Sequence, residues 1–202
     1  MTWNEIRLAA LQKMFSSDGP AINENDEAVQ QYLAAMPQAA NEAAGLLCAA
    51  GFGLRRTREL AVPEEGGRCT VDLTAALPGL YPGDPLEVYR QKPDGSLVPV
   101  TGAQLTAGRY LELPGTGGEP LLAVYTQAPQ PFGPDTPADA PIELQPGAAV
   151  LMPLYMASQL YKDDDITIAT QYRNEFEAAL EALPRGSFGM IGGGFSGVSG
   201  WV

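Results

Sequence analysis

The chain has 202 residues, 45% of them hydrophobic, which is enough to bury one large core or two small ones. It carries 24 acidic residues against 12 basic ones, a net charge of −12, and no basic run that could neutralise a row of phosphates, which argues against direct nucleic-acid binding. Because the sequence contains no histidine, it lacks the commonest general base and metal ligand, and we expect no enzyme, cofactor or metal site.

The lack of a targeting pattern and the spacing of the cysteines predict a protein made in a cytoplasm. No apolar run approaches the roughly 18 residues of a membrane span, and the first residues lack the pattern of a secretion signal. We therefore expect no membrane contact. Cys48 and Cys69 show no CxxC spacing and are predicted to be buried free thiols, with a disulfide left open.

The first helix is predicted directly after Met1. Thr2 and Glu5 fit a capping box. Apolar residues then recur at helical spacing, at Trp3, Ile6, Ala10 and Met14.

Two more helices are predicted before residue 53. Asn25 or Asp26 can cap the second, and Pro37 breaks or kinks it. The third runs from Pro37 to about Ala50, is rich in alanine, and has Gly51 as its expected C-terminal cap.

From about residue 54 the hydrophobic period changes to two. Strands are predicted at residues 56–62, 68–73, 86–91, 96–100, 109–113 and 121–127. Residues 92–96 read as a Pro-Asp-Gly turn, and frequent proline and glycine indicate a small antiparallel sandwich or barrel. The proline-rich residues 128–141 are expected to be an extended connection.

Helical spacing returns after residue 146. One predicted helix, which Pro153 either starts or kinks, has on one face Val150, Leu154, Ala157 and Leu160 or Tyr161. The last helix carries Ile168, Tyr172, Phe176, Ala179 and Leu183, and it ends at Pro184.

The acidic residues of this half are predicted to be structural. Residues 163–165 are three aspartates without calcium-loop spacing, so they are expected to cap the last helix. Arg173 and Glu177 form an ordinary i,i+4 pair. The pairs Glu175 with Glu177, and Glu64 with Glu65, have no surroundings that would split their pKa values for catalysis.

The last residues form an unusual tail. Residues 186–202 contain seven glycines and no charged residue, yet they also carry aromatic and aliphatic side chains. A solvated linker is polar, so we predict an extended arm that binds a partner through Phe188, Met190, Ile191, Phe195, Val198 and Trp201.

Residues 154–183 resemble the C-terminal helical pair of head–tail connector (adaptor, neck) proteins of tailed bacteriophages and their prophages. The shared pattern falls on Ala157, Leu160, Asp164, Asp165, Ala169, Tyr172, Phe176, Glu177 and Leu180. The N-terminal helices and the glycine-rich tail are also similar to those of such virion proteins, and the resemblance does not extend to the β middle.

This resemblance implies a mechanical role in the virion neck, after synthesis in the bacterial cytoplasm. It implies a homo-oligomeric ring of about twelve copies, a dodecamer, below the portal protein. Arms reach the portal, a neck or tail-completion protein binds below, and the acidic ring lets DNA pass without sticking.

Together these patterns predict an α+β chain. We expect a discontinuous helical bundle from residues 1–53 and 146–184, an inserted small antiparallel β-sandwich or barrel at 54–145, and an extended arm at 185–202. Bundle and ring packing is assigned to Leu160, Tyr161, Ile168, Tyr172 and Phe176.

Two other functions stay open. One is a different virion part, namely a tail-completion, baseplate or decoration protein. The other is a β-sandwich binding module for a carbohydrate or host protein, which an exposed cluster of Tyr81, Tyr89 and Tyr110 would favour. An enzyme would need a concave site with convergent carboxylates, which the sequence does not indicate.

Overall fold

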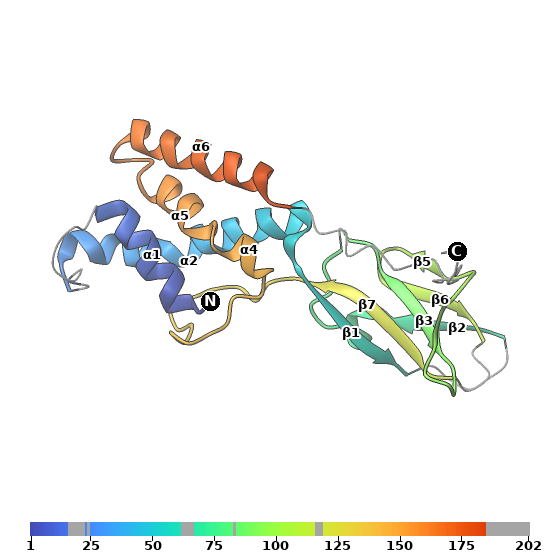
Figure 1. Cartoon of the computed structure of the whole chain (residues 1–202). Helices are drawn as coiled ribbons and strands as arrows, with labels where there is room; N and C mark the ends of the chain where they lie inside the picture. The colour runs from blue at the N-terminus through green and yellow to red at the C-terminus, as the bar shows by residue number, and fades with distance from the viewer. Residues whose placement is uncertain (16–22, 24, 62–66, 83, 116–118, 185–202) are drawn as a thin grey trace, which may run out of the picture.

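The structure is a computed structural model that describes residues 1–15, 23, 25–61, 67–82, 84–115 and 119–184. Helices and two small antiparallel sheets make up these residues, so the predicted α+β class is confirmed. Apart from the short helix α3 (Leu73–Ala76), the helices lie at one end and the sheets at the other, which makes the described part of the molecule elongated (Figure 1).

Helix α1 (Trp3–Phe15) begins at the predicted capping box. The Thr2 N–H donates to the Glu5 carboxylate at 2.9 Å, and the Glu5 N–H donates to the Thr2 hydroxyl at 3.3 Å. The expected apolar face of α1 is buried.

Helix α2 (Glu27–Leu47) is continuous, so the predicted division into two helices at Pro37 is wrong. Asp26 is its cap and accepts a 2.9 Å hydrogen bond from the Ala28 N–H. A proline inside a helix removes one backbone hydrogen bond. Here burial on both sides of the proline offsets that loss, at Val29, Met36, Ala39, Ala40, Ala43, Ala44 and Leu47.

A wide helical turn, η1 (Cys48–Phe52), follows α2. Cys48, rather than the predicted Gly51, occupies the C-cap position of α2. Gly51 instead has a φ of 92° within η1, a conformation that glycine adopts without steric cost, and the chain leaves the helix there.

The second half contributes α4 (Pro146–Ala149), α5 (Met152–Leu160) and α6 (Ile166–Ala182). The single helix predicted from residue 147 is split, because Pro153 lacks an N–H and takes a place in the first turn of α5. The predicted face is also shifted, since Val150 is 51% exposed. The buried residues of α5 are Met152, Pro153, Tyr155, Met156, Ala157, Ser158 and Leu160.

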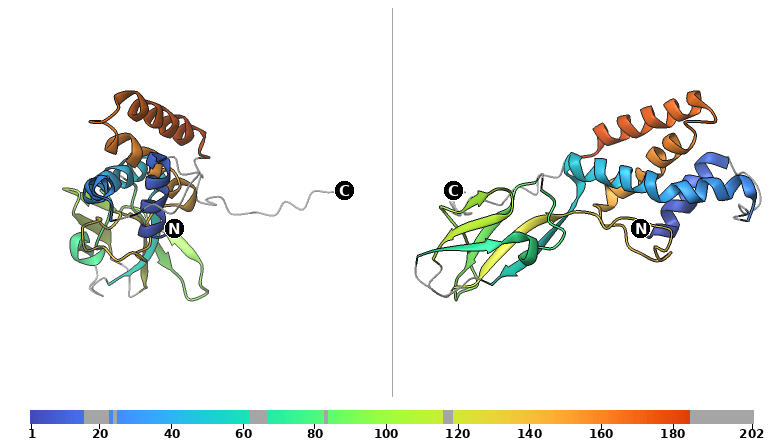
Figure 2. Two further views of the ribbon diagram at one scale, coloured as in Figure 1. Left: turned by 90° about the vertical axis from the view of Figure 1, so that its left-hand side faces the viewer. Right: turned by 180° about the vertical axis from the view of Figure 1, so that it is seen from behind.

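One hydrophobic cluster joins helices from both ends of the chain. It contains buried residues of α1, α2, η1, α4 and α5, together with Phe176 of α6. Helix α5 contacts α1, α2 and α6. Helix α6 therefore forms an outer layer over α5 (Figure 2).

The strands form two antiparallel sheets, with orders β1-β7-β3-β4 and β2-β6-β5. Their bounds are β1 (Leu54–Leu60), β2 (Arg68–Asp72), β3 (Glu87–Gln91), β4 (Leu97–Pro99), β5 (Gln104–Thr106), β6 (Tyr110–Pro114) and β7 (Leu121–Gln127). All six predicted strands are present. The sequence patterns miss β5 and the short helix α3 (Leu73–Ala76), which span too few residues to show a period.

The two sheets enclose a second hydrophobic cluster. The first sheet contributes Leu60, Val88, Leu121, Ala123 and Tyr125, and the second contributes Cys69, Val71, Leu111 and Leu113. Cys69 here and Cys48 in the helical cluster are both free and buried, so the predicted thiol state is confirmed.

The chain passes between the helices and the sheets at two adjacent points. Gly53 and Leu144 form an isolated antiparallel bridge, and the Gln145 N–H donates to the Phe52 carbonyl at 2.9 Å. A side chain at Gly53 would have its Cβ 2.5 Å from Cγ2 of Thr126. The junction is therefore closely packed.

The proline-rich connection lies along the helices without helix or strand over residues 128–140, as predicted. The Phe132 ring stacks on Trp3 with centroids 4.6 Å apart. The Asn41 side chain accepts from the Phe132 N–H at 2.7 Å and donates to its carbonyl at 2.9 Å. These contacts fix the connection against α1 and α2.

Candidate functional site

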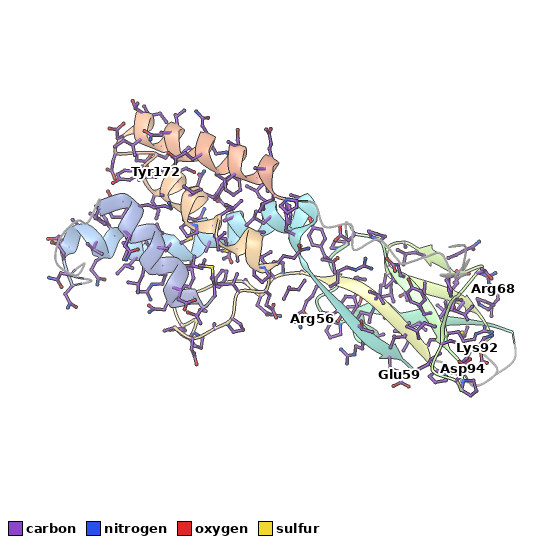
Figure 3. All side chains as sticks on the ribbon, in the orientation of Figure 1. Arg56, Glu59, Arg68, Lys92, Asp94 and Tyr172 are labelled. Atoms are coloured by element: carbon purple, nitrogen blue, oxygen red, sulfur yellow. The ribbon has the colours of Figure 1, made fainter. Side chains whose placement is uncertain are left out.

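Two of the residues predicted for bundle packing meet beside the turn between α5 and α6. The rings of Tyr161 and Tyr172 stack with centroids 6.3 Å apart and an interplanar angle of 11°. The Tyr172 hydroxyl donates to the Lys13 carbonyl at 2.6 Å, and the Tyr161 hydroxyl donates to the Met14 carbonyl (Figure 3 labels Tyr172). Because the last carbonyls of a helix have no partner within it, these hydroxyls satisfy the end of α1. Burial raises the pKa of both tyrosines.

The acidic turn between α5 and α6 also contacts α2. Tyr32 donates its hydroxyl hydrogen to Asp164, and this bond, together with burial, raises the pKa of Tyr32 to about 12. Asp165 accepts from the N–H groups of Thr167 at 2.8 Å and Ile168 at 3.1 Å, which confirms the predicted cap. Within the described ranges, no three His, Cys, Asp or Glu side chains converge on a metal position.

The inner face of α6 packs on α5 through aromatic rings. Phe176 contacts Tyr155 edge-to-face at 5.3 Å, and the Arg173 guanidinium lies 5.0 Å from the centre of the Tyr155 ring. The predicted Arg173–Glu177 pair is confirmed at 2.6 Å. The Tyr155 hydroxyl donates to Glu42 at 3.2 Å, and burial first and then the Glu42 charge raise the pKa of Tyr155.

The five predicted packing residues differ in their burial. Leu160 and Phe176 are buried, and Tyr161 and Tyr172 are half-buried against the helical cluster. Ile168 is 37% exposed and lies outside this cluster, so its predicted packing role within the chain is wrong. It stands in the first turn of α6, where the neighbouring residue, Ala169, takes the buried position instead.

Of the two carboxylate pairs, only Glu175 with Glu177 lies in the described part of the chain, and both side chains are exposed. Glu175 accepts from Gln171 at 3.2 Å and Glu177 pairs with Arg173, both on the exposed surface of α6. Glu64 and Glu65 lie outside the described residues.

The predicted arm also lies outside the residues that the structure describes. Its proposed contact residues are therefore known from the sequence only: Phe188, Met190, Ile191, Phe195, Val198 and Trp201.

The three tyrosines proposed for a carbohydrate or protein site lie in different surroundings. Tyr81 packs against the helical cluster. Tyr89, in the first sheet, donates to Glu87 at 2.6 Å. Tyr110, in the second sheet, is 38% exposed and lies 5.0 Å beneath the Arg109 guanidinium. The three tyrosines therefore do not form one shared surface.

The sequence does not indicate a groove that opens between the two sheets. Strands β4 and β5 are edge strands of the first and second sheet, and residues 100–103 connect them. The groove encloses about 410 Å³, and its apolar lining includes Leu86, Val88, Pro99, Val100, Leu105 and Leu111. Of the lining residues, Leu105 is 53% exposed.

The charges are distributed unevenly along the chain. Residues 54–127 contain nine acidic and seven basic residues, whereas the remaining residues contain 15 acidic and five basic ones. Most of the excess negative charge therefore lies outside the β part, in residues 1–53 and 128–202. In the β part, the charged residues Glu59, Arg68, Lys92 and Asp94 lie toward the tip farthest from the helices (Figure 3).

In the described part of the chain, no helix has both the length and the apolar character needed to cross a membrane. A comparison with protein-family models finds no matching family, and a comparison with curated proteins finds no match.

Proposed function

We propose that this chain is a structural subunit of the head–tail connector of a tailed bacteriophage or prophage. In this proposal it forms a ring, a dodecamer, in the virion neck. The ring joins the portal protein to a neck or tail-completion protein and surrounds the DNA channel. The subunit has a mechanical role without enzymatic chemistry, cofactor, metal or membrane contact.

The observation that carries the proposal is the α5–α6 hairpin, which holds the connector-like pattern. Ala157 and Leu160 are buried in α5, Asp165 caps α6, and Phe176 packs back on α5. The two helices of the hairpin thus pack on each other, and two tyrosine hydroxyls donate hydrogen bonds to the end of α1.

The charge distribution supports the channel role. The residues outside 54–127, which include all the helices of the bundle, carry 15 acidic and five basic residues, and a negative wall repels the phosphates of passing DNA. A protein that gripped DNA would need clustered lysine and arginine instead.

Mass photometry of the purified full-length chain, alone and mixed with the portal protein of the same genome, tests the proposal. We expect a discrete complex of portal and many copies of this chain. A chain that stays separate from the portal at every mixing ratio overturns the connector role. In that case a tail-completion, baseplate or decoration protein becomes the better description.

A further inference from the structure

We propose that the groove between β4 and β5 receives residues 186–202 from a neighbouring copy of this chain. This inference rests on the proposed ring and deepens it, because it names the contact that links one subunit to the next.

The two edge strands provide the receptor. Strand β4 pairs on one side with β3, and β5 pairs on one side with β6. Every residue of both strands is exposed. The second side of each edge strand therefore presents backbone groups to which a further strand can hydrogen-bond.

The groove also offers an apolar floor beneath these edges. Val88 and Leu111 line the groove and belong to the hydrophobic cluster between the sheets. Leu105, 53% exposed, stands at the rim. A large aromatic or aliphatic side chain placed here would extend the cluster and cover this exposed surface.

Residues 186–202 have the chemistry to occupy this receptor. They contain seven glycines, which permit close approach to an edge strand, and no charged side chain. In an extended conformation Phe188 and Met190 point to the same face, so both can enter the groove. Asp84 and Glu87 also line the groove, so an uncharged segment avoids the repulsion that an acidic segment of this chain would meet.

A contact from the arm of one copy to the groove of the next is heterologous. Repeated around an axis, a heterologous contact forms a ring when its rotation closes. The 17 residues of the arm span up to about 56 Å when extended, which allows them to reach a neighbouring subunit. If the arm filled the groove of its own chain, it would supply no link between subunits.

Disulfide trapping in the full-length chain tests the proposal. The double variant Leu105→Cys/Phe188→Cys is oxidised and separated on a non-reducing gel. Cys48 and Cys69 are buried and stay unreactive. We expect a ladder of covalent dimers and larger species. The matched variant Glu59→Cys/Phe188→Cys places the thiol on β1, the other edge strand of the first sheet, and should give no ladder.

The other outcomes are equally informative. A monomer that migrates as an internally cross-linked chain would show that the arm fills its own groove, and it overturns the proposal. The proposal is also overturned if no cross-link forms although both introduced cysteines react with a maleimide.

A charge placed in the groove provides an independent readout. Leu105→Arg should lower the population of multimers about tenfold relative to the matched variant Gln104→Arg, whose side chain alternates to the other face. Equal populations in two variants with the same melting temperature contradict the proposal. A ladder without portal binding would reject only the connector function, and portal binding without a ladder would reject only the arm contact.

Discussion

The hydroxyl oxygen of Tyr172 lies 2.6 Å from the carbonyl oxygen of Lys13, a residue 159 positions earlier in the chain. This bond connects the last helix to the end of the first. Tyr161, at the end of α5, makes a similar bond to Met14, so α1 holds both helices of the hairpin. The placement of the hairpin therefore depends on a few hydroxyl groups as well as on apolar packing.

Replacing Tyr172 by phenylalanine tests the value of this bond. The ring and its stacking on Tyr161 remain, and the half-buried Lys13 carbonyl loses its partner, so we expect a loss of about 1 kcal/mol in the free energy of unfolding. Urea unfolding followed by circular dichroism measures it. The control Tyr110→Phe changes an exposed ring and should alter stability by less than about 0.5 kcal/mol. Equal effects of the two substitutions would contradict the assigned role of the bond.

Phe176 and Ile168 provide a matched pair on one helix. Phe176 is 1% exposed and packs on Tyr155, so Phe176→Ala should cost about 3–5 kcal/mol through lost burial and a cavity. Ile168 is 37% exposed, so Ile168→Ala should cost less than about 1 kcal/mol. Chemical denaturation of the two variants measures the change in the free energy of unfolding at each position. A similar cost at the two positions would mean that α6 packs in a different register.

The junction between helices and sheets is tested at Gly53. A Cβ at this position would lie 2.5 Å from Thr126 and 2.9 Å from the Cys48 sulfur, so Gly53→Ala should destabilise the chain by about 1–3 kcal/mol. In α2, Gly45 has open space around its Cα, and Gly45→Ala should stabilise the helix by about 0.5–1 kcal/mol. The melting temperatures of the two variants should therefore shift in opposite directions. A Gly53→Ala variant with an unchanged melting temperature would show that the junction is not closely packed.

The ion pair of Asp72 and Arg109 predicts a dependence of stability on acid pH. The Arg109 guanidinium, 2.6 Å away, lowers the pKa of Asp72 from 3.8 to about 2. Since the folded pKa is the lower one, the stabilisation is complete above a pH of about 4 and is lost as the pH falls toward about 2.

Replacing Asp72 by asparagine removes this effect. The melting temperature of the native chain should exceed that of Asp72→Asn near neutral pH, and the difference should shrink as the pH falls below about 4. Arg109→Gln should show the same trend, because it removes the other partner. A difference that stays constant with pH would contradict the ion pair as its cause.

Local features of this protein were predictable from the sequence alone. The capping box of Thr2 and Glu5, the caps Asp26 and Asp165, and the turn at residues 92–96 all appear where the sequence places them. Each of these involves hydrogen bonds between groups within four residues of one another. The change of hydrophobic period near residue 54 likewise reflects the local geometry of helix and strand, so it identified the α+β class.

Tertiary contacts decided the remaining features. Pro37 lies inside a continuous helix because buried neighbours offset one lost hydrogen bond, and no local pattern contains that balance. Ala169 rather than Ile168 is buried because α5 determines which side of α6 is covered. The sheet order β1-β7-β3-β4, and the groove beside β5, arise from pairing between strands far apart in the chain. Such long-range pairing depends on the summed packing of distant residues, which the spacing of residues within a single segment does not encode.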